Sequence, residues 1–377
     1  MKGPLSQIGR YRVEEVLGKG GMATVYRAML EGAEGFERPV ALKVLHPHLA
    51  DDPEFVRMFN EEARLASRLA HPALVPVRDL GVLDGTHFMV MDLLEGETLG
   101  AVHERFRDKD LPFPRGHACF VMAAVLDGLH YAHELLDEAG RPLAVVHRDV
   151  SPKNIFIGFG GAVRLVDFGI ARTEPTKGLT RLGVVKGTLP YMAPEQARGA
   201  PVDRRADLFA AGVVLYELLT SKVPLDVDAT DAQRRALAEG RLAPDFKRIH
   251  TAVRPVLERA LAPLPDGRYA TAAEFADALR KALPLVEPNH EPEKLAALVA
   301  SRGVRRKPLA EKPKRAPKKR KGRGEDEAAP ASGAASKRPK APPPPPVQWE
   351  GATLMLVTAV VLLVAGLVYT FTSAASG

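Results

Sequence analysis

The chain has 377 residues, 46% of them hydrophobic, so its length allows two or three domains and its composition allows a sizeable core. The single cysteine, Cys119, excludes an intramolecular disulfide framework, and we expect it to be buried in the apolar run 118–126. The formal net charge of +7 is unevenly distributed: residues 302–340 hold fifteen Lys or Arg and four Asp or Glu, which leaves the remainder at about −4.

Residues 11–28 are predicted to form two short strands joined by a turn that contains Gly18, Gly20 and Gly21. Glycines let backbone N–H groups approach phosphate oxygens without an intervening side chain. The turn alone leaves two interpretations open, a phosphate site and a plain hairpin.

The apolar run 40–44 predicts a buried strand that carries one charge, Lys43. A buried Lys is costly unless it is paired; the alternative is an edge strand whose Lys extends to solvent. A helix is predicted over 52–69, and Glu62 rather than Glu61 falls on its apolar face by 3–4 spacing. We therefore expect Lys43 to pair with Glu62.

Further strands are predicted at 75–80 and 86–92, and the segment 92–96 then joins a small strand-rich lobe to a larger helical one. Such lobe junctions are favoured nucleotide sites. Helices are predicted over 114–136 and 207–219 and from residues 231, 253 and 271. His130 and His133 are interpreted as packing residues of the first of these helices, because no Cys or carboxylate completes a metal site with them.

The segment His147-Arg148-Asp149-Val150-Ser151-Pro152-Lys153-Asn154 places a base, two cations and an amide within eight residues. Asp167-Phe168-Gly169 begins eighteen residues after Asp149, beyond short strands predicted at 155–157 and 163–166. Each motif alone is a weak match, but in this order and at this spacing they are typical of the catalytic loop and magnesium-binding loop of a protein kinase.

The globular pattern fades after about residue 283, although residues 284–300 keep some helical character, and residues 302–346 are rich in Lys, Arg, Pro, Ala and Gly. This composition predicts a disordered linker over 285–349. Residues 351–371 carry no charge and are long enough, at about 31 Å as a helix, to cross a bilayer. No secretory signal peptide is predicted at the start, and the basic linker favours a cytoplasmic location for the larger part, with 372–377 as a short external tail.

Residues 11–283 resemble the eukaryotic-type (Hanks) Ser/Thr protein kinases, and residues 20–26 and 147–154 are most similar to the bacterial membrane-anchored branch. The resemblance rests on at least six ordered motifs and covers about three quarters of the chain. It implies an α+β, two-lobed protein kinase fold over 11–284, with a small β-rich lobe at 11–95 and a larger helical lobe at 96–284. It also implies ATP and two Mg²⁺ (or Mn²⁺) ions in the cleft.

The resemblance implies a role for each matching residue. Lys43 would hold the ATP phosphates and pair with Glu62, Asp149 would accept the proton of the substrate hydroxyl, and Asn154 and Asp167 would hold magnesium. The other implied positions are the phosphate-loop glycines Gly18, Gly20 and Gly21, the adenine neighbours Val25, Ala41 and Phe156, the gatekeeper Met91, the hinge residue Leu93, the buried pair Glu195 and Arg268, and Asp207, which would brace the catalytic loop.

Two positions depart from the family pattern. Ala23 stands where the third glycine is usual, so this site must accept an ordinary backbone conformation. Ser151 stands where Ser/Thr kinases usually have the Lys that contacts the γ-phosphate, and our hypothesis is that Lys153 supplies this charge from two residues further along. The departure leaves the preference for Ser/Thr over other hydroxyls open.

The segment 170–193 is long and polar, as functional or mobile connectors are. Arg148 is a candidate to bind a phosphate on it after autophosphorylation, with Thr180 the first candidate site and Thr176 the second. The alternative is a solvated, flexible loop whose threonines have no regulatory role. Thr188, just before Ala193-Pro194-Glu195, is expected to shape the substrate-binding loop.

The kinase-like region and the basic segment 302–323 indicate which partners to expect. We expect Ser/Thr-containing protein substrates, contact of residues 302–323 with anionic membrane lipids, and no nucleic-acid partner; a nucleic-acid site and a solvated spacer are the alternatives for 302–323. A homodimer is a candidate state. The expected function is an ATP-dependent protein kinase in membrane signalling at the inner (plasma) membrane, and the alternative is a membrane-tethered, nucleotide-binding pseudokinase scaffold.

Overall fold

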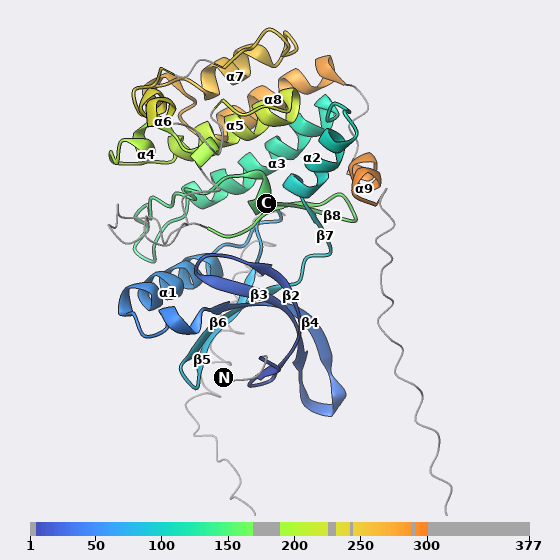
Figure 1. Ribbon diagram of the computed structural model, residues 1–377, viewed down its shortest axis with the longest axis vertical. Helices are drawn as coiled ribbons and strands as arrows, with labels where there is room; N and C mark the ends of the chain where they lie inside the picture. Colours follow the sequence, from blue (N-terminus) through green and yellow to red (C-terminus); the bar gives the residue numbers. More distant parts are fainter. Residues whose placement is uncertain (1–4, 169–188, 225–230, 242–243, 288–291, 301–377) are drawn as a thin grey trace, which may run out of the picture. The chain divides into compact units, whose positions relative to one another are not determined.

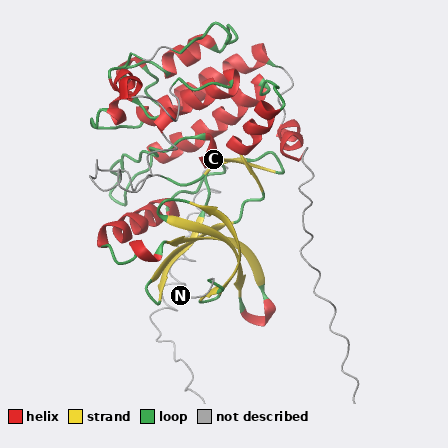
Figure 2. Cartoon of the chain, viewed as in Figure 1, coloured by secondary structure: helices red, strands yellow, loops and turns green. Residues whose placement is uncertain are grey.

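The computed structural model describes residues 5–168, 189–224, 231–241, 244–287 and 292–300, all within one compact unit, Met1–Lys307 (Figure 1). Strands gather in an N-terminal lobe and helices in a C-terminal lobe (Figure 2). The described part of the chain thus has the predicted α+β, two-lobed architecture.

The N-terminal lobe is a six-stranded antiparallel sheet in the order β1-β2-β3-β4-β6-β5. Because side chains alternate along a strand, β4 sends Leu42 and Val44 into one apolar cluster and Leu45 into another, beneath helix α1. The elements are β1 (Gln7–Ile8), β2 (Tyr11–Lys19), β3 (Ala23–Glu31), β4 (Glu37–Leu45), α1 (Pro53–Ser67), β5 (Val77–Leu83) and β6 (Thr86–Asp92), with short 3₁₀ turns at Ala33–Gly35 and Pro47–Leu49.

Helix α1 begins where its sequence predicts. The Asp52 side chain accepts the Glu54 N–H at 2.9 Å, and Pro53 occupies the first helical position, where its missing N–H costs nothing. Its buried face includes Phe59, Glu62 and Ala63. The charged residue on this face is therefore Glu62, as the 3–4 spacing predicts.

The C-terminal lobe is built around two strongly buried helices, α3 and α5. Helix α3 packs against α5 and α8, and nearly every residue of α5 from Ala206 to Leu218 is buried. A small sheet, β7-β8-β9, lies at the edge of this lobe nearest the hinge. The elements are β7 (Gly96–Thr98), α2 (Leu99–Asp108), α3 (Arg115–His133), β8 (Ile155–Gly158), β9 (Val163–Leu165), α4 (Pro194–Ala197), α5 (Arg205–Thr220), α6 (Asp231–Ala238), α7 (Arg254–Ala260), α8 (Ala272–Val286) and α9 (Pro292–Ala300), with 3₁₀ turns at Pro152–Asn154, Leu189–Tyr191 and Pro265–Gly267.

The predicted linker 285–349 is wrong at its start. Helix α8 continues to Val286, and α9 packs against β8 with Leu295 and Val299 fully buried. The Arg105 guanidinium donates to the Leu298 carbonyl at 3.1 Å and holds α9 beside α2. Short, Pro-flanked helices of this kind acquire their stability from tertiary packing, so helical character in 284–300 did not by itself indicate an ordered helix.

Within the described ranges, no helix combines the length and apolar character needed to cross a bilayer. The segment 351–371, for which a membrane span is predicted, lies outside those ranges, as do Thr173, Thr176, Thr180 and Thr188.

Candidate active site

Lys43 lies on β4 and contacts two carboxylates, one from each lobe. Its Nζ is 2.6 Å from Glu62 Oε1 on α1 and 3.0 Å from Asp167 Oδ1 of the C-terminal lobe. The competing residue Glu61 pairs instead with Arg57 on the exposed face of α1. The predicted pairing of Lys43 with Glu62 is therefore confirmed.

Lys43 and Asp167 each stabilise the charged form of the other, whereas burial raises the pKa of Glu62. Burial acts to lower the pKa of Lys43, but the negative charges of Asp167 and Glu62 outweigh it and raise that pKa above its ordinary value. The Lys43 charge in turn holds the pKa of Asp167 below its usual range, against the effect of burial. Lys43 is thus a fixed cation and Asp167 a fixed anion at neutral pH.

The glycine-rich turn joins β2 to β3 above this cluster. The Gly20 N–H donates to the Ala23 carbonyl at 2.9 Å, and the His46 N–H donates to the Met22 carbonyl at 2.9 Å, so the turn is tied to the end of β4. Ala23 begins β3, is buried and is not among the residues with positive φ. An alanine is therefore accommodated at the third-glycine position without backbone strain.

The catalytic loop is supported from below by Asp207 in the first turn of α5. Its carboxylate accepts the N–H groups of His147 at 2.8 Å and Arg148 at 2.7 Å, and also contacts His133 Nε2 at 2.8 Å. Burial acts to raise the pKa of Asp207, but the hydrogen bonds from His133 and from the His147 N–H outweigh it and lower the pKa. Arg148 has a φ of 64°, a strained conformation for a residue with a side chain, and the two N–H bonds to one carboxylate hold it there.

His147 connects this loop to the Asp167 segment. Its Nδ1 accepts the Asp149 N–H at 3.2 Å, and its Nε2 lies 3.2 Å from the Val166 carbonyl. An N–H can only donate and a carbonyl can only accept, so Nε2 carries the proton and the ring is neutral. Burial lowers the pKa of His147 accordingly. Phe168 packs on this ring, with centroids 4.6 Å apart.

Asp149, Lys153 and Asn154 lie together on the floor of the site. Asn154 donates from Nδ2 to the Asp149 carbonyl at 2.8 Å, and Lys153 Nζ is 3.6 Å from Asp149 Oδ2. The Lys153 side chain is half exposed, whereas Ser151 is 1% exposed. The charge that the family pattern expects at 151 is therefore present beside Asp149, on Lys153.

The predicted nucleotide neighbours come from both lobes. Val25 is in register with Lys43 across β3 and β4, and Ala41 is in register with Met91 across β4 and β6. Phe156 lies on β8 and Leu93 in the hinge between β6 and β7. Gly18 lies in β2, where an added Cβ would meet no atom of the described residues within 4 Å.

The oxygen atoms of Asn154 and Asp167 are suitable ligands for magnesium. Among the described residues, no group of three or more His, Cys, Asp or Glu forms a metal cluster. Asn154 and Asp167 offer an amide oxygen and a carboxylate, and Mg²⁺ is typically bound by one or two such groups plus substrate phosphates and water. The residues present therefore fit ATP-bound magnesium better than a metal held by the protein alone.

Glu195 and Arg268 form the predicted buried pair beneath the substrate-binding side. Two guanidinium nitrogens donate to the two carboxylate oxygens at 2.6 and 2.8 Å, and the Arg268 side chain is fully buried. The sequence interpretation missed a second polar pair here: the Tyr191 hydroxyl donates to Glu217 Oε2 at 2.7 Å. It also missed His133 as a partner of Asp207. A single Glu in the apolar helix α5 and a His in the apolar helix α3 were the available clues.

Comparison with known proteins agrees with this geometry. Residues 11–278 match the protein kinase domain family. The chain is 45% identical over 278 residues to the tyrosine-protein kinase MasK of Myxococcus xanthus and 35% identical over 273 residues to the serine/threonine-protein kinase PrkC of Bacillus subtilis. These matches cover 73% and 71% of this chain but 43% and 39% of the relatives, so the chain matches less than half the length of either.

A longer match is to the serine/threonine-protein kinase PknL of Mycobacterium tuberculosis, at 36% identity over 86% of this chain and 81% of the relative. The crystal structure of the M. tuberculosis PknI kinase domain superposes with a TM-score of 0.56 at 32% identity, covering 74% of this chain and 99% of that one. With its lobes, its Lys43–Glu62 pair and its catalytic loop in place, the chain belongs to the protein kinase family, in its bacterial eukaryotic-type branch.

Proposed function

We propose that this protein is an ATP- and Mg²⁺-dependent protein kinase that transfers the γ-phosphoryl group to Ser or Thr hydroxyls of proteins. The observation that carries the proposal is the contact of Lys43 with both Glu62 and Asp167, which joins the two lobes around Asp149 and Asn154. Phosphoryl transfer depends mainly on positioning and charge neutralisation, and these groups provide both.

Each residue has a task in the proposed mechanism. Lys43, kept protonated by its two carboxylates, binds the ATP phosphates, and the glycine-rich turn at Gly18, Gly20 and Gly21 covers them. Asp149 accepts the proton of the substrate hydroxyl as its oxygen attacks the γ-phosphorus and ADP leaves. Bound Mg²⁺ ions, held by Asn154 and Asp167, would neutralise the charge on the phosphates.

We assign to Lys153 the charge that a Lys at position 151 would otherwise supply. Its Nζ lies 3.6 Å from Asp149 Oδ2, within reach of a phosphoryl group placed next to that carboxylate. Lys153→Ala is expected to lower turnover about tenfold or more, and Lys153→Arg to retain it. Near-normal turnover of Lys153→Ala would remove this role.

A tyrosine acceptor is the second candidate function. Ser151 is small, no cation stands at that position, and a relative with 45% identity is named a tyrosine-protein kinase. The relatives PrkC and PknL, named serine/threonine-protein kinases, favour the first candidate. The acceptor hydroxyl is therefore the property to measure first.

The proposal extends to regulation and location. Autophosphorylation of Thr180 or Thr176 would place a phosphate near Arg148, and mass spectrometry showing neither site modified would exclude this switch.

Membrane attachment through 351–371, with 302–323 on anionic lipid, predicts that the full chain resists extraction from membranes by salt. Release by high salt alone would contradict the span. Dimerisation remains part of the proposal only if sedimentation shows a dimer of the full chain.

The test is transfer of radiolabel from γ-labelled ATP by the full chain to a generic protein acceptor, followed by phosphoamino-acid analysis. Label on Ser and Thr is the expected result. Label on Tyr alone would establish the second candidate. Absence of label, with ATP still bound, would assign the protein to the nucleotide-binding scaffolds instead.

A further inference from the structure

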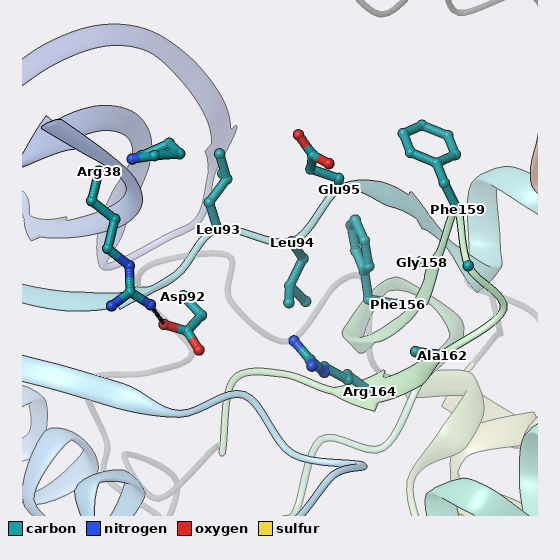
Figure 3. Close-up of a pocket in the computed structure, with 12 residues that line it drawn as sticks. Arg38, Asp92, Leu93, Leu94, Glu95, Phe156, Gly158, Phe159, Ala162 and Arg164 are labelled. Atoms are coloured by element: carbon teal, nitrogen blue, oxygen red, sulfur yellow. Dashed lines mark hydrogen bonds and ion pairs between the residues drawn. The ribbon is translucent and has the colours of Figure 1, made fainter.

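A pocket of about 490 Å³ lies against the hinge between the lobes (Figure 3). It shares Leu93 and Phe156 with the predicted nucleotide site, but Lys43 and Asp167 are not among its lining residues. Its walls come from four separate segments: the start of β4, the hinge, β8, and the turn from β8 into β9. Its volume is that of a typical small-ligand or side-chain pocket.

Asp92, one of the lining residues, is an ionised carboxylate whose two oxygens already accept hydrogen bonds from arginines. Arg78 donates to Asp92 Oδ1 at 2.8 Å and Oδ2 at 2.6 Å, and Arg38 donates to Oδ1 at 3.0 Å. The hydrogen bond from Arg78 is the main reason why the pKa of Asp92 is lowered, and the charges of Arg38 and Arg164 add to it. Asp92 therefore has little capacity left to neutralise a third guanidinium.

Arg164 is that third guanidinium. In Figure 3 its side chain extends from β9 toward Leu94 and Asp92, while Arg38 approaches Asp92 from the opposite side. Arg164 Nε is buried and, within the part of the chain that the structure describes, has no hydrogen-bond acceptor. A buried donor without an acceptor costs about 1–3 kcal/mol, which a bound anion would relieve once the Arg164 side chain turns toward it.

The balance of charge indicates the kind of anion. Arg38 and Arg164 line the pocket with Asp92 and Glu95, and Arg78, which is not a lining residue, pairs with Asp92; these five groups together leave a net charge of +1. A single carboxylate matches this charge, whereas a phosphate dianion would lie near two carboxylates with only one positive charge in excess. Leu94, Pro39 and Phe159 provide apolar walls beside the guanidinium groups.

We propose that this pocket docks an acidic side chain of a partner protein, presented on an extended segment with apolar neighbours. Arg164 and Arg38 bind its carboxylate through charge-assisted hydrogen bonds. Arg38 belongs to the N-terminal lobe and Arg164 to the C-terminal lobe, so the bound carboxylate spans the hinge.

The experiment is a peptide display selection on the full chain in detergent. The probes are nonapeptides with a central Glu or a central Gln and randomised flanking positions. The wild-type protein is expected to enrich central Glu with apolar neighbours. Arg164→Gln and Arg38→Gln are each expected to lower the affinity of a selected peptide about tenfold, the loss of one charged hydrogen bond.

Two controls isolate the pocket. The basic segment 302–323 will attract acidic peptides non-specifically, but it is unchanged in the Arg164→Gln protein, so the difference between the two proteins reports the pocket alone. Arg57→Gln, an exposed Arg on α1 far along the chain from the hinge, is expected to leave binding unchanged. Circular dichroism melting confirms that each variant is folded.

The proposal is overturned if Glu is not preferred over Gln, or if the preference survives in both pocket variants. A stronger selection for phosphoserine than for Glu, lost in Arg164→Gln, would assign the pocket to phosphopeptides and overturn the carboxylate proposal. The readout is binding and not phosphoryl transfer, so its result is independent of whether the protein proves to be an active kinase.

Discussion

Glu195→Gln tests the buried ion pair that supports the substrate-binding side of the C-terminal lobe. The Arg268 guanidinium makes five hydrogen bonds: two to Glu195, and one each to the carbonyls of Ala262, Pro263 and Arg205. The side chains of Arg268 and Glu195 are 0% and 5% exposed. The substitution keeps the shape of the side chain but leaves the Arg268 charge buried without its counter-charge.

The expected loss follows from this burial. Removing one partner of a buried ion pair costs about 3–5 kcal/mol, and we expect the lower figure, about 3 kcal/mol, because the Gln oxygen still accepts one hydrogen bond. That is about a hundredfold in the ratio of folded to unfolded protein, and a large part of a typical total stability of about 5–15 kcal/mol.

The assay is urea unfolding followed by far-ultraviolet circular dichroism. The single tryptophan, Trp349, lies outside the described residues, so its fluorescence is a poor monitor of this domain. Glu274→Gln is the matched control, because Glu274 pairs with Arg259 at 3.3 Å with both side chains about half exposed, and such pairs contribute about 0–1 kcal/mol. A loss for Glu195→Gln no larger than that for Glu274→Gln would refute the reasoning.

Three further predictions follow from single positions. Glu62→Gln is expected to lower the rate of phosphoryl transfer about tenfold or more, whereas Glu61→Gln, at an exposed position of the same helix, is expected to leave it unchanged; equal initial rates for the two variants would contradict the assignment of Glu62. Burial raises the pKa of Cys119 to about 12, so iodoacetamide at pH 8 is expected to label it only after unfolding, and full labelling of the native protein would show that the thiol is accessible. Leu295→Asp is expected to abolish hydrogen-exchange protection across α9, with Glu293→Gln as the exposed control; protection retained in Leu295→Asp would show that α9 does not depend on its buried face.

The sequence predicts the features that depend on local pattern. Glu62 was distinguishable from Glu61 because only one of them shares a helix face with Phe59 and the other apolar residues of 52–69. Asp207 was identifiable because a charge at the start of a strongly apolar helix needs buried partners, and the structure supplies them from His133 and the catalytic loop.

The features that the sequence does not predict depend on contacts between distant segments. Helix α9 has only nine residues, and it is ordered by burial of Leu295 and Val299 and by the bond from Arg105, 193 residues earlier. The hinge pocket is assembled from four segments, and none of its residues is unusual in its own local context: Arg164 becomes notable only when β9 places it beside Asp92.

The central claim is that Asp149 acts in phosphoryl transfer and not in nucleotide binding. The most direct measurement is therefore a paired one, the dissociation constant for Mg²⁺–ATP and the rate of label transfer, made on the full chain and on Asp149→Asn. We predict that transfer falls by about 10²–10⁴-fold, the usual contribution of a catalytic base, while the dissociation constant stays within about threefold. Transfer by Asp149→Asn close to that of the wild-type protein would contradict the account.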